Sequence, residues 1–251
     1  MALYAPEQQE VLAQIAIDPA QGEIPMAEVL LSQVEIAGKI VLADAMHTQS
    51  KLSQQIVEAH ADYIWIVKDN QPLTRQAIEA LFASQDPVQE GLDFETCRMV
   101  NKAHGRIEDR CLTTSSLLKD YLDWPDLQQV FRLERNFTFL RKGQVVHTEH
   151  MVHYGLTSLP HHQANAAQLL QMKRLYWQIE NGLHYRRDVT FHEDATRMSH
   201  PHASHNLTTV HNTILSLFAR LGCRNAAFTR RLLDADLDKA FSLLISAHPR
   251  L

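Results

Sequence analysis

Asp44 is the first residue whose type and position suggest chemistry. It follows the apolar run Lys39-Ile40-Val41-Leu42-Ala43, and the lack of polar alternation in that run predicts a strand buried on both faces. In open α/β sheets the carboxyl ends of the strands face the ligand crevice, so a carboxylate there is well placed to act. Capping of a following helix or turn is the alternative, and the residues alone favour neither.

Glu180 is the second candidate. It lies in the segment Tyr176-Trp177-Gln178-Ile179-Glu180-Asn181-Gly182-Leu183-His184, and helical spacing places Glu180, His184, Arg187 and Asp188 on one face. Such a face is usually solvated and stabilised only weakly by pairs of side chains one turn apart. On the residues alone, the solvated face is therefore the preferred interpretation.

Basic pairs supply candidate contacts to phosphate. These pairs are Lys173-Arg174, Arg186-Arg187 and Arg230-Arg231, and for the last of them a solvated helix face is the better interpretation. The histidines 200, 202 and 205 are loosely spaced. Without a cysteine or acidic cluster in a recognised pattern, they favour a solvated loop over a metal site.

Composition indicates an ordinary globular protein. The chain has 251 residues, 45% hydrophobic and 21% charged, with a net charge of -5. That charge gives no overall attraction to nucleic acid, although a local basic face is compatible with it. The three cysteines are widely spaced, which suits reduced thiols, and neither a membrane span nor a leader peptide is evident. We therefore expect a soluble, cytoplasmic protein. The Walker, dinucleotide and Gly-x-Ser-x-Gly motifs are absent.

The first third of the chain has the rhythm of an α/β core. Residues 2–17 predict a hairpin and residues 26–34 a helix. Buried strands are expected at 39–45 and 63–67, each followed by a helix, at 51–59 and about 73–82. Strand and helix alternating in this way predict a parallel βαβ unit.

The pattern changes after residue 92. Alternating polar and apolar residues predict antiparallel strands at 94–100, 130–135 and 148–154, with Gly143 in a turn. Helices are expected at about 165–184, 206–221, 225–233 and 237–247. We therefore predict three segments: residues 1–92 form the first part of an α/β core, 93–160 a β-rich insertion, and 161–251 a helical part.

Several blocks of this sequence together resemble the DDE transposases of the H-repeat-associated group. Each block would be weak evidence alone, but they occur in the family's order and spacing. They are residues 38–49 (GKIVLADAMHTQ), Asp62-Tyr63 through Lys68-Asp69-Asn70-Gln71, residues 104–110 (HGRIEDR), Trp177 to His184, and Asp188 to Ala195.

The resemblance implies an RNase H-like fold: a mixed sheet with flanking helices and a β-rich insertion before the last catalytic helix. It matches Asp44 to the second catalytic aspartate and Glu180 to the catalytic glutamate, and it matches Arg174 to a position that is usually arginine. In the intact family such carboxylates hold two Mg²⁺ or Mn²⁺ ions that promote phosphodiester cleavage and strand transfer. The implied partners are DNA, as transposon ends and target, and a second copy of the chain in a homo-oligomer.

The sequence departs from this family at its start. Relatives carry the first catalytic aspartate in an Asp-Gly-Lys segment on the first strand, and no such segment precedes Met1-Ala2-Leu3-Tyr4. Asp18 is the nearest acidic residue at a strand end, on the wrong strand. We therefore expect the first strand to be missing and catalysis to be impaired. A non-catalytic DNA-binding or regulatory remnant is the alternative.

The resemblance also makes a geometric prediction. The carboxylates of Asp44 and Glu180 should lie on the same side of the sheet, close enough to share a metal ion or a water. If they do not, Asp188 and Glu193 are the next carboxylates to consider.

Overall fold

The computed structural model describes residues 1–17, 20–83, 93–103, 105–198, 201–223 and 225–245. These residues form two compact units. Unit 1 comprises Met1–Val34 and Leu175–Leu251, and unit 2 comprises Glu35–Arg174. Asp18 and His200 lie outside the described residues. Among the described residues, no helix combines the length and the apolar character needed to cross a membrane.

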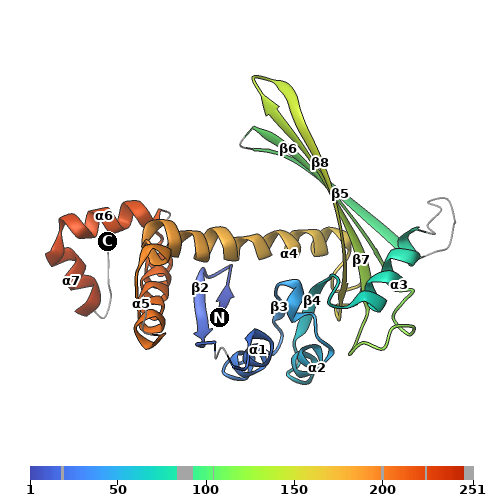
Figure 1. Cartoon of the computed structure of the whole chain (residues 1–251), viewed down its shortest axis with the longest axis horizontal. Helices are drawn as coiled ribbons and strands as arrows, with labels where there is room; N and C mark the ends of the chain where they lie inside the picture. Colours follow the sequence, from blue (N-terminus) through green and yellow to red (C-terminus); the bar gives the residue numbers. More distant parts are fainter. Residues whose placement is uncertain (18–19, 84–92, 104, 199–200, 224, 246–251) are drawn as a thin grey trace. The chain divides into compact units, whose positions relative to one another are not determined.

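Unit 2 is built on one six-stranded mixed sheet (Figure 1). β3 and β4 run parallel, as predicted, and the other neighbouring strands are antiparallel. The mixed sheet with its flanking helices confirms the α/β expectation and is consistent with the RNase H-like fold. The strand order is β3 (Ile40–Leu42), β4 (Asp62–Val67), β8 (Gln144–Thr157), β7 (Gln129–Arg141), β6 (Arg106–Ser115) and β5 (Phe94–Ala103).

The connections between the first strands confirm the predicted rhythm. A short 3₁₀ turn, η1 (Ala45–His47), and α2 (Ser50–Glu58) join β3 to β4, and α3 (Pro72–Ala83) follows β4. β4 is buried along most of its length because its apolar residues meet other elements on both faces of the sheet.

The four long strands β5–β8 extend beyond the elements that cover their other ends (Figure 1). β7 and β8 form the predicted hairpin, and Gly143 occupies its turn with φ +82°, a conformation that favours glycine. β6 was not predicted, because its first half is dominated by charged residues and only its last four residues form a continuous buried run. The predicted insertion, residues 93–160, falls within unit 2, and its boundaries remain a prediction.

The core of unit 2 lies between the sheet and α4 (Ala166–Gln178). Leu169 and Leu170 of α4 pack with Phe131 and Leu133 of β7, and all four are nearly inaccessible to solvent. Gly155 of β8 permits this packing, because a Cβ there would lie 2.1 Å from the Phe131 ring and 2.4 Å from the Trp65 carbonyl oxygen.

Unit 1 contains a small antiparallel hairpin and several helices. β1 (Ala2–Ala5) pairs with β2 (Glu10–Gln14), as predicted. Tyr4, Leu183, Leu215 and Phe218 form the centre of its core. The helices assigned to this unit are α1 (Glu23–Ser32), α5 (Pro201–Arg220), α6 (Ala226–Ala235) and α7 (Leu237–Ile245).

The segment that carries Glu180 is helical, as predicted over 165–184, but it is not α-helical throughout. α4 ends at Gln178 and is followed by two π-helical turns, η2 (Ile179–His184) and η3 (Arg186–Thr190). Tyr4 approaches this segment closely, since a Cβ on Gly182 would lie 3.0 Å from the Tyr4 hydroxyl. π-Helical turns are rare in proteins, but those that do occur are frequently found at functional sites.

Candidate active site

Asp44 lies directly after β3, at the carboxyl end of the strand, and its side chain is 62% exposed. Its Oδ1 accepts a hydrogen bond from the backbone N–H of Ala45 at 2.8 Å, so Asp44 also caps the turn η1. The structure therefore confirms the capping role. Because the carboxylate remains accessible to solvent, the catalytic role of Asp44 stays a prediction.

The Lys68–Gln71 block that follows β4 holds the loop carrying Asp44. The Asn70 side-chain amide donates to the carbonyl of Ala45 at 2.8 Å, and that of Gln71 donates to the carbonyl of Thr48 at 3.0 Å. The Thr48 hydroxyl in turn donates to the carbonyl of Ile66 at 2.8 Å. Three side-chain hydrogen bonds to backbone carbonyls thus link the Asp44 loop to β4 and the turn that follows it, which stabilises one conformation of the loop.

Two lysines lie near the Asp44 carboxylate. Lys68 Nζ is 3.9 Å from Asp44 Oδ1. Lys173, on α4, is buried, and burial lowers its pKa to about 8, although the charge of Asp44 raises this pKa and that of Lys68 lowers it. Lys173 was predicted as a DNA contact, and the structure places it inside unit 2 beside the candidate site.

Glu180 lies in η2, immediately after α4. It belongs to unit 1 and Asp44 to unit 2. The close approach of the two carboxylates therefore remains a prediction.

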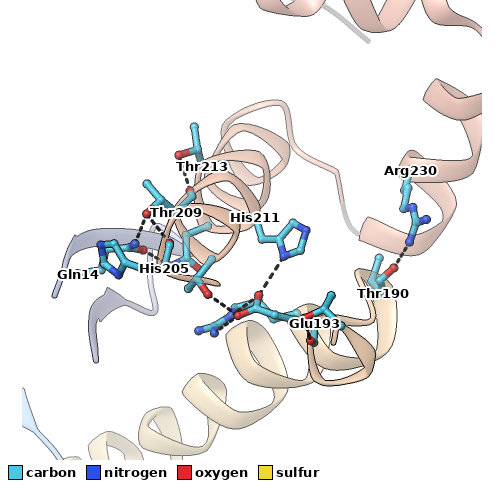
Figure 2. Close-up of polar contacts among 12 residues, drawn as sticks. Gln14, Thr190, Glu193, His205, Thr209, His211, Thr213 and Arg230 are labelled. Atoms are coloured by element: carbon cyan, nitrogen blue, oxygen red, sulfur yellow. Dashed lines mark hydrogen bonds and ion pairs between the residues drawn. The ribbon is translucent and has the colours of Figure 1, made fainter. Parts of the chain in front are cut away.

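Glu193, named as a fallback carboxylate, is instead part of an internal polar network of unit 1 (Figure 2). Its Oε2 accepts from Arg187 Nε at 3.0 Å and contacts His211 Nδ1 at 2.9 Å, and its Oε1 accepts from Arg187 Nη2 and from the Thr208 hydroxyl, both at 2.5 Å. Burial alone would raise the pKa of Glu193, but these hydrogen bonds outweigh burial and lower it to about 2. With both oxygens engaged, Glu193 is a structural anion.

Asp188, the other fallback carboxylate, lies in η3 and is half-buried. Burial, followed by the charge of Asp194, raises its pKa. A raised pKa favours the protonated form of a carboxyl group, which is the weaker ligand for a cation.

The predicted DNA-contacting arginines have different environments. Arg187 is bound to Glu193 and its side chain is only 18% exposed. Arg186 donates to the Gln9 side chain at 3.2 Å. Arg174 is exposed, and its Nη1 lies 2.9 Å from the sulfur of Met99, a weak acceptor. Of the three, Arg174 and Arg186 are therefore better placed than Arg187 for an external anion.

The described residues fit a metal ion only in part. Asp44 offers a hard, accessible oxygen of the kind that Mg²⁺ prefers. Nowhere in the described part of the chain do three His, Cys, Asp or Glu side chains gather into a group that could hold an ion. Lys68, only 3.9 Å from the Asp44 carboxylate, would also repel a cation there.

Asp44 thus lies where open α/β sheets bind their ligands, at the carboxyl end of a parallel strand, and its carboxylate is accessible. The Transposase DDE domain family matches residues 1–217 of the chain. This protein belongs to that family, whose members generally use divalent metal ions.

Curated relatives agree with this assignment. The chain is 25% identical over 237 residues to the "H repeat-associated putative transposase YhhI" of Escherichia coli (strain K12), and 26% identical to the "Putative protein YbfL" of the same strain. Both alignments cover 92% of this chain and 61% of the relative. The "H repeat-associated putative transposase YbfD" of that strain is 30% identical over 116 residues, 45% of this chain and 44% of the relative. The chain thus spans about three fifths of the length of the first two relatives.

Sequence reasoning did not assign a role to Asn70 or Gln71. Both stand in a block that resembles the family, so the signal was present, but only the tertiary structure shows that their side chains hold the Asp44 loop.

Proposed function

We propose that this chain forms part of the catalytic core of a DNA transposase, in which Asp44 and Glu180 supply two of the carboxylates that hold Mg²⁺ or Mn²⁺. The observation that carries the proposal is the exposed Asp44 at the end of β3, on a loop that three side-chain hydrogen bonds hold in place. Membership in the Transposase DDE domain family supports the same reaction. The substrate would be DNA, as transposon ends and target, and the protein would act on it in the cytoplasm.

The chemistry assigns separate tasks to the side chains. Bound divalent ions supply the activation of the attacking oxygen and the stabilisation of the leaving oxygen. Asp44 would hold such an ion through its accessible carboxylate, while the Asn70 and Gln71 amides keep its loop from moving. Glu180 would contribute from η2. Lys68, 57% exposed beside Asp44, would turn from that carboxylate to a DNA phosphate when an ion is held.

DNA binding without cleavage is the second candidate function. One observation favours it: the charged side chains that the structure places around Asp44 are the cations Lys68 and Lys173. Two positive charges at a carboxylate suit a phosphate contact better than they suit a divalent cation.

The experiment compares two proteins on DNA that carries matched transposon ends, with Mg²⁺ or Mn²⁺. One is this chain, and the other is this chain extended at its N-terminus by the Asp-Gly-Lys segment of a relative. We expect little or no cleavage by the chain itself, because two carboxylates leave the metal site short of a ligand and of negative charge. We expect cleavage by the extended protein.

Single substitutions separate the two candidate functions. Asp44→Asn and Glu180→Gln should each abolish the restored cleavage, whereas Asp69→Asn, an exposed acid in the neighbouring turn paired with Arg75, should leave it unchanged. An extended protein that binds the DNA but never cuts it would support the binding function. Robust cleavage by the unextended chain would show that another acid completes the site, with Asp18 as the first to mutate.

A further inference from the structure

Arginines gather on one face of the long strands β5–β8. Arg106, Glu108 and Arg110 alternate along β6 and therefore point to the same side of the sheet. On β7, Arg135 pairs with Arg110 and Phe137 with Glu108. This is the face that α4 covers further along the sheet, because Met99 and Leu133, which share it, belong to the core under α4.

One buried carboxylate, that of Glu108, forms ion pairs with several guanidinium groups on this face. Glu108 is 6% exposed, and its Oε2 lies 2.5 Å from Arg110 Nη2 while its Oε1 lies 2.6 Å from Arg135 Nη2. Arg106 Nη2 is 3.9 Å from the same carboxylate. Burial lowers the pKa of Arg110, and the charges of Arg135 and Arg174 lower it further. We call Arg106, Arg110, Arg135 and Arg174 the arginine face.

The arginine face has an excess of positive charge. Three of its four guanidinium groups, those of Arg106, Arg110 and Arg135, lie near the single carboxylate of Glu108. Glu149, further along the same side, contacts His147 at 3.1 Å. Arg174 rests against the sulfur of Met99 at 2.9 Å, which is a weak acceptor. A cluster with more cations than carboxylates is favourable in the folded protein when an external anion completes it.

An aromatic ring lies under two of these arginines. The guanidinium carbon of Arg106 is 5.3 Å from the centroid of the Phe137 ring, and that of Arg135 is 4.8 Å from it. Such contacts help to hold the planar groups in place. Arg135 donates to Glu108 and is 11% exposed, whereas Arg106, with a side chain 47% exposed, is accessible to phosphate oxygens.

The excess of positive charge continues toward Asp44. His153 lies on the same side of β8, since it pairs with Leu133, and its pKa is lowered by burial and then by the charges of Arg135, Lys68 and Lys173. One end of this strip is therefore the arginine face and the other is the pair of lysines beside Asp44. The exposed cations of this strip, Arg106, Arg174 and Lys68, would present positive charge to a polyanion that reaches Asp44.

We propose that the arginine face binds the sugar–phosphate backbone of DNA and guides the strand toward Asp44. This inference rests on the proposed function and adds to it the surface that holds the substrate. The contacts would go to phosphates, so binding would depend on salt and only weakly on base sequence.

The experiment measures the affinity of the full chain for a fluorescent DNA duplex at several salt concentrations. The test variant is Arg106→Gln with Arg174→Gln. Arg174 is exposed and the Arg106 side chain is 47% exposed, so both can change with little effect on folding. The matched control is Arg98→Gln with Lys102→Gln. It removes the same charge from β5, on the opposite side of the sheet, where Arg98 is paired with Asp109.

We expect the test variant to bind DNA about tenfold more weakly, and its plot of log affinity against log salt to be shallower by about two. The control should match the parent chain. Equal losses in test and control, or a test variant that binds like the parent, would overturn the arginine face while leaving DNA binding intact. A folded parent that fails to bind DNA at low salt would overturn the proposed function as well. Equally tight binding of polyglutamate would assign the face to an acidic polypeptide instead of DNA.

Discussion

Glu193 binds Arg187 through both carboxylate oxygens, and this pair ties the π-helical segment after α4 to α5. Arg187 lies on η3, and the same carboxylate also accepts from Thr208 and contacts His211, which are one turn apart on α5 (Figure 2). His211 in turn stacks on Phe191, with ring centroids 4.5 Å apart. One carboxylate thus joins two elements of unit 1 close in sequence to Glu180.

Glu193→Gln should destabilise unit 1 by about 2 kcal/mol, because it leaves a poorly exposed Arg187 without its charged partner.

The parent protein should also lose stability in acid. The folded pKa of about 2 lies below the ordinary value of 4.5, so the stabilisation is complete above pH 4.5 and is lost as pH falls toward 2. The variant should show a smaller change over this range. Urea unfolding at several pH values measures both effects, and an unchanged pH dependence in Glu193→Gln would contradict the assignment.

Gly182→Ala should destabilise the protein through a single contact. The added methyl would lie 3.0 Å from the Tyr4 hydroxyl, whereas the next nearest atom, the Tyr4 Cζ, is 3.7 Å away. In a Tyr4→Phe background the same substitution should therefore be neutral or stabilising by up to about 1 kcal/mol, since alanine favours helical turns over glycine. A double-mutant cycle of unfolding free energies tests this coupling. Equal effects in the two backgrounds would refute the role of the hydroxyl.

Asn70→Asp should release the Asp44 loop. The substitution keeps the size of the side chain but replaces the amide that donates to the Ala45 carbonyl with an acceptor. In the N-terminally extended protein we expect at least a tenfold loss of cleavage rate, with DNA affinity nearly unchanged, because the substitution misplaces a ligand without removing a DNA contact. Asn136→Asp, at an exposed residue of β7 on the side of the sheet opposite the arginine face, is the control. A loss confined to DNA affinity would argue against a positioning role for Asn70.

Lys173→Met should stabilise unit 2 by about 1–3 kcal/mol near neutral pH, because it removes a buried charge and keeps the apolar volume. The folded pKa of about 8 lies below the ordinary 10.5, so the parent gains stability as pH rises from 8 to 10.5 and the difference should narrow there. Lys68→Met, at a side chain 57% exposed, should change stability little. Destabilisation by Lys173→Met at pH 7 would show that the lysine is a net stabilising group.

Local patterns in the sequence determined much of the secondary structure. The buried runs before Asp44 and Lys68 predicted the parallel pair β3 and β4, and alternation with a turn at Gly143 predicted the β7–β8 hairpin. These predictions were correct because a strand buried on one face alternates apolar and polar residues, whereas a strand buried on both faces is a continuous apolar run. The family resemblance was likewise readable from the sequence, because its motifs are local and occur in a recognisable order.

Only the tertiary structure decided the environment of the charged side chains. Spacing placed Lys173 and Arg187 among surface cations, yet one is buried beside Asp44 and the other is bound to Glu193. The sequence pattern also failed to predict β6. In the structure, the charged first half of this strand is stabilised by ion pairs of Arg110 and Arg135 with Glu108. Whether a charge is solvated, paired or buried depends on residues distant in sequence. Periodicity reports only the side of an element on which a residue lies, and cannot report what packs against it.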